Sequence, residues 1–107
     1  MNKYGARRCS EDNIWFDSLA EREHYRELKL RALAGEITDL EVHPRYDLIV
    51  CNRKVGRMTL DFAYTLVATG EPVCVDVKGG RATRTEAYRL RRKVFEAIYG
   101  LTVTEVG

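Results

Sequence analysis

Two segments with an alternating pattern of apolar residues constrain the fold of this chain more than any other feature of its sequence. The segments 59–67 and 73–78 carry apolar residues at every second position, which is typical of β-strands that bury one face. The alternating residues are Leu60, Phe62, Tyr64 and Leu66 in the first segment, and Val73, Val75 and Val77 in the second. Thr69-Gly70-Glu71-Pro72 supplies turn residues between them, so the sequence predicts two strands joined by a turn.

A helix is predicted before this strand pair, over residues 18–34. Its apolar stripe at helical spacing consists of Tyr25, Leu28 and Ala32. Ser18, with an acidic residue three positions later, matches a helix-capping sequence, and Gly35 is a suitable end for the helix.

The remaining elements complete the order α-β-β-β-α-β. A second helix is predicted over residues 83–99, and Gly100 ends it. Its apolar stripe consists of Ala87, Leu90, Val94 and Ile98. Residues 46–51 and 101–106 have the composition of strands, and residues 52–57 that of a turn. This order predicts a fold of the α/β (α+β) class.

The length of 107 residues suits one domain, and we expect residues 1–107 to form it, with residues 1–12 as a flexible arm. No apolar stretch approaches the roughly 18 residues that cross a membrane, and the N-terminus lacks the hydrophobic run of a secretory signal. We therefore expect a cytoplasmic protein with no membrane partner. Cys9, Cys51 and Cys74 lack the spacing of a disulfide framework or a zinc site, so we expect three reduced cysteines.

The positive charge of the chain is unevenly distributed. The net charge of +2 is small, but residues 78–93 contain seven basic residues against the single Glu86. Lys3, Arg7 and Arg8 form a second basic cluster near the N-terminus. Such clusters suit the phosphate backbone of a nucleic acid, and on charge alone a solvated helix face is an equally good interpretation.

Three polar residues on the predicted strand pair can converge. Asp76 and Lys78 lie two positions apart, so their side chains share the face opposite the valines. Asp61 likewise lies opposite the apolar face of its own strand. In an antiparallel hairpin with an even-numbered loop, Asp61 lies across from Asp76 or Lys78, whereas an odd-numbered loop without a bulge places it on the other face.

Two carboxylates and a lysine in this arrangement suit metal-assisted hydrolysis of a phosphodiester bond. Asp61, Asp76 and the backbone carbonyl of Val77 are oxygen ligands of the kind that Mg²⁺ prefers. A cation there polarises the phosphate and lowers the pKa of a bound water, and Lys78 stabilises the developing charge or orients the water. The alternative is a surface ion pair between Asp76 and Lys78, which is the commoner meaning of Asp-x-Lys on its own.

With Asp61 on its second strand and Asp76 and Lys78 on its third, the chain resembles the PD-(D/E)XK nuclease superfamily. Over nearly its full length it also resembles a family of short phage and prophage endonucleases, a domain of unknown function related to archaeal Holliday-junction resolvases. The matching segments are Asn2-Lys3-Tyr4-Gly5-Ala6, Phe16-Asp17-Ser18, Glu21, Tyr25, Glu27-Leu28, Asp61-Phe62, Tyr64, Asp76-Val77-Lys78-Gly79, Tyr88, Lys93, Phe95, Tyr99-Gly100 and Glu105-Val106. Leu60 stands where the superfamily name has proline, and Val75 stands where relatives often carry another acid.

The resemblance implies a restriction-endonuclease-like core, in which a mixed sheet is flanked by helices. It implies a divalent-metal endodeoxyribonuclease that cuts branched or structured DNA with Mg²⁺ or Mn²⁺, needs no small-molecule cofactor and acts as a homodimer. It also assigns Glu21 as a further metal ligand, where the local pattern alone leaves open that Glu21 caps its helix at Ser18. The rival interpretations are a catalytically inactive DNA-binding module and an interaction protein whose Asp-x-Lys is only an ion pair.

On this interpretation the basic residues bind DNA phosphates, which positions a duplex without reading its sequence. The predicted contacts are Arg7 and Arg8 in the arm, Arg81, Thr83 and Arg84 between the catalytic strand and the second helix, and Arg89, Arg92 and Lys93 on one face of that helix. His24 and His43 are interpreted as ordinary, partly exposed residues, because no Cys or His accompanies them at ligand spacing.

Overall fold

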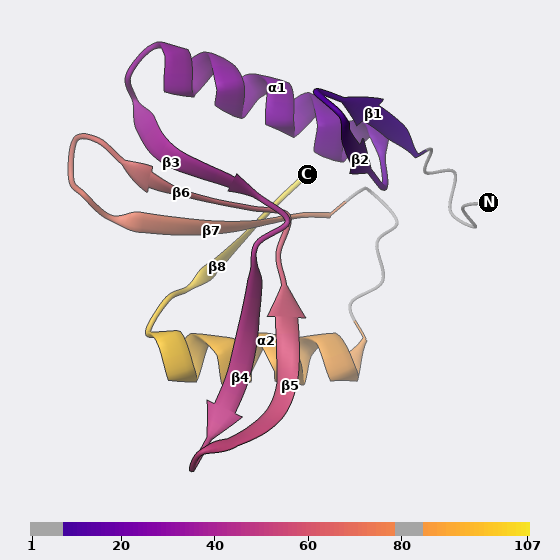
Figure 1. The fold of residues 1–107 in the computed structure, drawn as a ribbon, viewed down its shortest axis with the longest axis vertical. Helices are drawn as coiled ribbons and strands as arrows, with labels where there is room; N and C mark the ends of the chain where they lie inside the picture. The colour runs from indigo at the N-terminus through magenta and orange to yellow at the C-terminus, as the bar shows by residue number, and fades with distance from the viewer. Residues whose placement is uncertain (1–7, 79–84) are drawn as a thin grey trace.

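A four-stranded mixed sheet lies at the centre of the computed structural model, which describes residues 8–78 and 85–107. The strands are β3 (Ile37–Val42), β6 (Phe62–Leu66), β7 (Pro72–Val77) and β8 (Val103–Val106), in the spatial order β3-β6-β7-β8. The first three pair antiparallel, and β8 joins β7 in parallel. Figure 1 shows helix α1 (Leu19–Leu33) over one face of this sheet and α2 (Glu86–Tyr99) on the opposite side. The predicted class, a mixed sheet flanked by helices, is confirmed.

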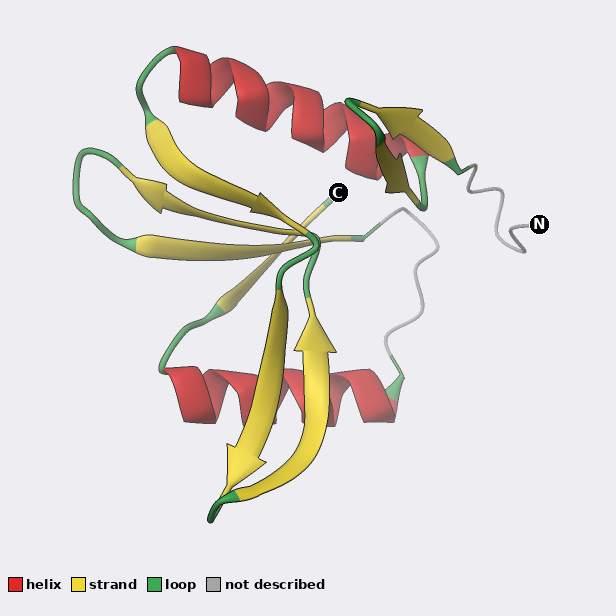
Figure 2. Cartoon of the chain, in the orientation of Figure 1, coloured by secondary structure: helices red, strands yellow, loops and turns green. Residues whose placement is uncertain are grey.

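Two small hairpins lie outside the central sheet (Figure 2). β1 (Cys9–Glu11) pairs with β2 (Ile14–Phe16), and β4 (Arg45–Val50) pairs with β5 (Arg53–Thr59). Cys51 and Asn52 join β4 to β5 with φ angles of 50° and 65°, and two positive φ angles in succession are the geometry of a type I′ hairpin turn. Cys51 is exposed at this turn.

Helix α1 forms where its sequence predicts it. The Ser18 hydroxyl accepts a hydrogen bond from the backbone N–H of Glu21 at 3.1 Å, which caps the first turn. Gly35 follows the last turn with φ +80°, a conformation that glycine adopts without strain. No helix in the described parts of the chain is long and apolar enough to cross a membrane.

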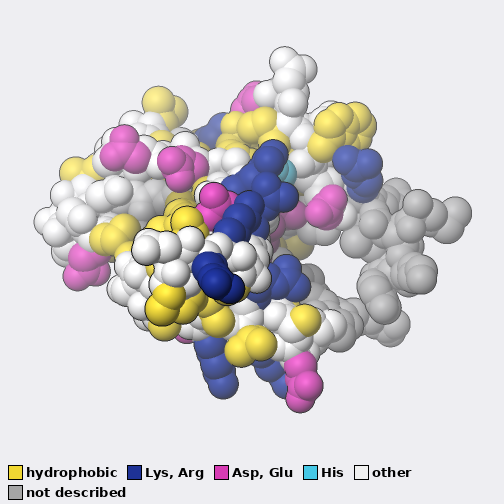
Figure 3. All heavy atoms as spheres, turned by 60° about the horizontal axis from the view of Figure 1, so that its bottom comes forward, with side chains coloured by type: hydrophobic (Ala, Val, Ile, Leu, Met, Phe, Trp, Pro, Cys, Tyr) yellow, Lys and Arg dark blue, Asp and Glu magenta, His cyan; other side chains and the backbone are white. Residues whose placement is uncertain are grey.

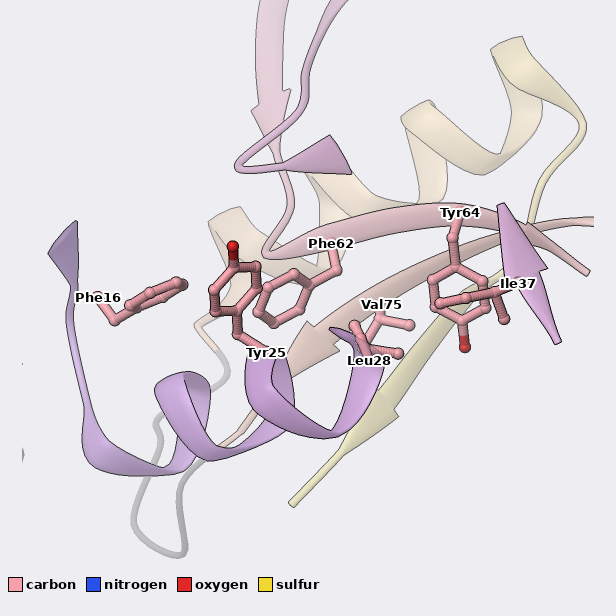
Figure 4. Packing of buried hydrophobic residues seen from close by; sticks show 7 residues of the cluster. All are labelled: Phe16, Tyr25, Leu28, Ile37, Phe62, Tyr64 and Val75. Carbon is pink, nitrogen blue, oxygen red and sulfur yellow. The ribbon is translucent and has the colours of Figure 1, made fainter. Parts of the chain in front are cut away.

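The first hydrophobic core lies between α1 and the sheet, and Figure 4 shows its seven buried residues. Tyr25 packs its ring 5.1 Å from that of Phe16 and stacks 6.2 Å from that of Phe62. Leu28 and Val75 continue the contact between the helix and the sheet. Burying each such side chain contributes about 1.5–3 kcal/mol to the free energy of unfolding, so these contacts fix the position of α1 against the sheet.

The second core lies on the other face of the sheet. Its buried residues are Leu48, Met58, Leu60, Cys74, Phe95 and Val103. They come from the β4–β5 hairpin, the sheet and α2, and the Tyr46 ring packs 4.8 Å from Phe95. The hairpin and α2 therefore share one core with the underside of the sheet.

The predicted order holds only for the two helices and the central sheet, because β1, β2, β3 and β5 were not predicted, and the identity of the first sheet strand was wrong. The predicted strand 46–51 corresponds to β4, which lies outside the central sheet, and the predicted turn 52–57 belongs to β5. The true first strand is β3, whose exposed polar residues at an edge of the sheet resemble a connection. The segment 59–67 is also not one strand, because the chain bends after Thr59. Leu60 consequently enters the second core and Phe62 the first.

The predicted apolar face of α2 was wrong in part: Val94 packs against the second core, but the other three residues of the predicted stripe are exposed. Leu90 is 64% exposed and Ile98 is 37% exposed, whereas Phe95 is fully buried. The rings of Tyr46 and Tyr99 lie 5.3 Å apart, so contact with the hairpin turns the aromatic side of the helix inward. Hydrophobic spacing alone did not distinguish this aromatic side from the aliphatic one.

The predicted flexible arm also needs correction. Residues 9–11 form β1, and Glu11 accepts hydrogen bonds from Arg26 at 2.6 Å and Lys29 at 2.8 Å on α1. These contacts tie the first hairpin to the helix, so the prediction is wrong for this part of the arm. Residues 1–7 lie outside the described residues.

Candidate active site

Asp61 lies where the hairpin chain re-enters the sheet, just before β6. Its Oδ2 accepts a hydrogen bond from the backbone N–H of Val77 at 2.6 Å, and its own N–H donates to the carbonyl of Val75 at 3.1 Å. Thr65 pairs with Pro72, so six residues, an even number, lie between these two paired positions of β6 and β7. In this register Asp61 lies across from Asp76, which is the arrangement predicted for an even-numbered loop.

Asp76 and Lys78 form an ion pair at the end of β7. Nζ of Lys78 lies 2.9 Å from Oδ2 of Asp76, and the two side chains are only 15% and 10% exposed. Nζ also lies 3.7 Å from the centroid of the Tyr88 ring, a cation–π contact. The pair is thus largely buried and differs from the exposed surface ion pair of the alternative interpretation.

Tyr88 links α2 to these strands. Its hydroxyl lies 2.7 Å from Oδ2 of Asp76 and 3.0 Å from Oε2 of Glu105 on β8. Glu105 in turn pairs with Arg92 at 3.2 Å. Tyr88 is half-buried, and its hydroxyl serves as a polar contact within the site.

Glu21 reaches the same place from α1. It is 5% exposed on the apolar stripe of the helix, and its Oε1 lies 2.6 Å from Nε2 of His43. Ligand atoms of Glu21, His43 and Asp61 all lie within 4.8 Å of one another. The structure therefore brings the four predicted catalytic residues, Glu21, Asp61, Asp76 and Lys78, into one region at the end of the sheet.

His43 is the member of this region that sequence reasoning missed. It follows β3, and its backbone N–H donates to the carbonyl of Asp61 at 2.9 Å, which places the two residues side by side. Figure 1 shows the junction where β3 leads into β4 and β5 returns into β6. The link to Asp61 depends on β3 and its register, so spacing along the sequence carries no signal for it.

Burial and contacts with one another shift the pKa values of the acidic residues. Burial, a hydrogen bond with Asp76 and the charge of Glu21 together raise the pKa of Asp61 to about 8. Burial also acts to raise the pKa of Asp76, but hydrogen bonds from Asp61, Lys78 and Tyr88 outweigh it and lower that pKa. Burial raises the pKa of Glu21, although the hydrogen bond with His43 opposes this. The Asp61–Asp76 pair therefore favours holding one proton between its two carboxyl groups.

These residues fit a divalent cation. Glu21, Asp61 and Asp76 offer carboxylate oxygens, and the backbone of Val77, the predicted carbonyl ligand, is held against Asp61. Crowded, partly buried carboxylates are costly when ionised, and a bound cation offsets that cost. The donor set is thus one that Mg²⁺ or Mn²⁺ accepts.

The structure places only part of the predicted DNA-binding set. Arg89 and Lys93 are exposed on α2, whereas Arg92 is paired with Glu105. Arg8 lies 4.0 Å from Asp17 and over the Trp15 ring. Arg7, Arg81, Thr83 and Arg84 lie outside the described residues. Figure 3, which brings the side of the hairpin and α2 forward, shows Lys and Arg side chains spread across it with Asp and Glu among them.

The sequence model of one protein family matches residues 1–104, nearly the whole chain. The family is described as "Protein of unknown function (DUF1064)". Searches of curated proteins and of solved structures found no significant match. The chain therefore belongs to the DUF1064 family.

Proposed function

We propose that this protein is a divalent-metal-dependent endodeoxyribonuclease that hydrolyses phosphodiester bonds in branched or structured DNA. The observation that carries the proposal is the convergence of Glu21, Asp61, Asp76 and Lys78 from α1, the start of β6 and the end of β7. The resemblance to PD-(D/E)XK nucleases, noted from the same residues, supports the same chemistry.

The acidic residues would hold the cation, with Asp61 just before β6, Asp76 on the neighbouring β7 and Glu21 on α1. When bound, the cation supplies polarisation of the scissile phosphate and a bound water of lowered pKa. Asp61 is fixed by the N–H of Val77, so its carboxylate keeps its orientation without the substrate.

Lys78 would stabilise the charge that develops on the phosphate. Its ammonium is held between the Asp76 carboxylate and the Tyr88 ring, both within 3.7 Å. A positive charge fixed beforehand needs no reorganisation during the reaction, which makes it more effective than a mobile one.

Exposed Arg89 and Lys93 on α2 are suited to the DNA backbone, and their contacts would be independent of sequence. A preference for branched DNA is supported by the resemblance to Holliday-junction resolvases. A two-fold dimer would present two sites to two strands, so we expect a homodimer on the substrate.

Cleavage of labelled four-way junctions, flaps and linear duplex in Mg²⁺ or Mn²⁺ tests the proposal. We expect Asp76→Asn and Lys78→Ala to lower the cleavage rate at least about 100-fold. The exposed Asp47–Lys54 pair of the hairpin, 3.3 Å apart, supplies matched controls. Asp47→Asn and Lys54→Ala should remain within about threefold of wild type, as surface substitutions usually do. Wild-type protein that binds these DNAs and cuts none of them with either metal would instead be a DNA-binding module.

A further inference from the structure

His43 contributes a nitrogen donor to a site that otherwise offers oxygen. Its Nε2 lies 2.6 Å from Oε1 of Glu21, and the donor atoms of Glu21, His43 and Asp61 lie within 4.8 Å of one another. Two ligands of one ion lie up to roughly 4–4.5 Å apart, since each is about 2.0–2.3 Å from it. The spacing of the three groups is therefore compatible with one shared cation after a small adjustment.

The position of the His43 ring is fixed from several sides. Its backbone N–H is bonded to the carbonyl of Asp61 at 2.9 Å. Its ring lies 5.7 Å from that of Phe16 in the first core, and Nε2 is directed at Glu21 on α1. A ring held in this way presents the same nitrogen to the site without a further loss of rotamer freedom.

The second histidine of the chain provides a contrast. His24 also lies on α1, but its Nδ1 is 3.6 Å from Glu27 and its ring is 5.6 Å from that of Phe62. It is not part of the group formed by Glu21, His43 and Asp61. The two side chains therefore have the same chemistry, but of the two only His43 lies beside Glu21 and Asp61.

Imidazole changes which cation such a site prefers. Mg²⁺ binds oxygen almost exclusively and retains several waters, so a nitrogen donor adds little to its affinity. Imidazole is a good ligand for first-row transition metals, whose affinity for mixed nitrogen and oxygen sites rises from Mn²⁺ towards Co²⁺ and Ni²⁺.

We infer that His43 is a direct metal ligand together with Glu21 and Asp61, and that the site therefore prefers a divalent transition metal ion over Mg²⁺. This inference concerns the cation of the proposed nuclease site and thus deepens the proposed function. A hydrogen bond that only orients Glu21 is the alternative role of His43.

Metal titrations of the full chain without DNA test the inference. Wild-type protein should bind Mn²⁺ and Co²⁺ at least about tenfold more tightly than Mg²⁺, as measured by calorimetry. His43→Gln should weaken Co²⁺ and Mn²⁺ binding by about 10–100-fold and change Mg²⁺ binding by less than about threefold. The matched variant His24→Gln should bind all three ions as wild type does. Equal losses for all three ions in His43→Gln, or no loss for any, would overturn the inference.

A second measurement uses the wild-type protein, so it does not depend on the folding of the His43 variant. In NMR spectra of the histidine rings, Co²⁺ should strongly shift the signals of one of the two histidines. The spectrum of His24→Gln, in which only the His43 ring remains, identifies which histidine this is. The signals of His43 should move at substoichiometric Co²⁺, and unchanged His43 signals at saturating Co²⁺ would reject direct ligation.

The two proposals fail in different experiments. Co²⁺ that binds through His43 to a protein that cuts no DNA would retain the inference and remove the nuclease function. Mg²⁺-dependent cleavage by a protein whose metal affinities are unchanged in His43→Gln would retain the nuclease function and remove the inference.

Discussion

The hydroxyl of Tyr88 lies 2.7 Å from Oδ2 of Asp76, while the ring of the same side chain lies under the Lys78 ammonium. One residue of α2 thus contacts both members of the ion pair at the end of β7. The contact makes the placement of α2 part of the geometry of the candidate active site.

Tyr88→Phe should therefore weaken the site while keeping its shape. The ring under Lys78 remains, but Asp76 loses a hydrogen bond of a kind worth about 1–3 kcal/mol. We expect a loss of about 1 kcal/mol in the free energy of unfolding and a fall in cleavage of about 3–10-fold. Urea denaturation and the junction-cleavage assay measure the two effects.

Tyr99→Phe is the matched control, because the Tyr99 hydroxyl donates to the exposed carbonyl of Asp47 at 2.8 Å, away from the site. It should leave cleavage at the wild-type rate. Equal cleavage by both variants would show that the Tyr88 hydroxyl does not position Asp76.

Asp61 should make the metal-free protein less stable as the pH rises. Folding raises the pKa of this acid from 3.8 to about 8, so the folded state binds the proton more tightly than the unfolded state does. Its stabilising contribution is complete below about pH 4 and is lost progressively up to about pH 8. The lowered pKa of Asp76 acts in the opposite sense and only in acid, where stability falls as the pH drops below about 4.

Asp61→Asn removes this pH dependence and can still accept the hydrogen bond from Val77. We expect the metal-free variant to exceed wild type by about 1–2 kcal/mol at pH 8, and the difference to shrink towards pH 4.5. Adding Mn²⁺ should raise the melting temperature of wild type more than that of the variant. Parallel stability–pH curves for the two proteins would contradict the assignment of the raised pKa to Asp61.

The local part of the site was predictable from sequence. Alternation on one strand places Asp76 and Lys78 on the same face, and this holds for any strand with that sequence. The position of Asp61 across from Asp76 required one more fact, the even number of loop residues, which the register of β6 and β7 provides.

The other features of the fold and of the site depend on contacts between segments that are distant in the sequence. β3 is an edge strand with mostly exposed polar residues, so alternation is weak and its bulge between Thr38 and Glu41 interrupts it. Leu90, predicted to be buried, is exposed and Phe95 is buried, because the β4–β5 hairpin packs against the aromatic side of α2. His43 follows the edge strand and could not be assigned to the site before that strand was placed.

The sequence left open whether Glu21 caps its helix or binds the metal, and these two roles can be tested separately. The helix cap is the Ser18 hydroxyl, which accepts from the Glu21 backbone N–H, whereas the Glu21 carboxylate meets His43. Ser18→Ala should lower stability by about 1 kcal/mol and leave metal affinity unchanged. Glu21→Gln should lower Mn²⁺ affinity at least about tenfold with little loss of stability, because a buried carboxylate becomes a neutral amide. Calorimetry and urea denaturation of both variants test this, and a Glu21→Gln protein that is destabilised but binds Mn²⁺ normally would return Glu21 to a structural role.

The three basic residues of α2 predicted to bind DNA should behave differently from one another. Arg89 and Lys93 are exposed, while Arg92 is 30% exposed and paired with Glu105 at 3.2 Å. Arg89→Ala with Lys93→Ala should weaken DNA binding at low salt and reduce the slope of log affinity against log salt by about 2, since each phosphate contact contributes about 0.9. Stability should stay within about 0.5 kcal/mol of wild type.

Arg92→Ala should instead lower stability by about 1 kcal/mol, because it leaves the partly buried Glu105 without one of its partners. Arg92→Ala should change the slope of log affinity against log salt only slightly. Fluorescence anisotropy at several salt concentrations, together with urea denaturation, separates the two classes of residue. An Arg92→Ala protein of wild-type stability whose salt slope falls by about 1 would show that Arg92 binds a phosphate and that its pairing with Glu105 yields to DNA.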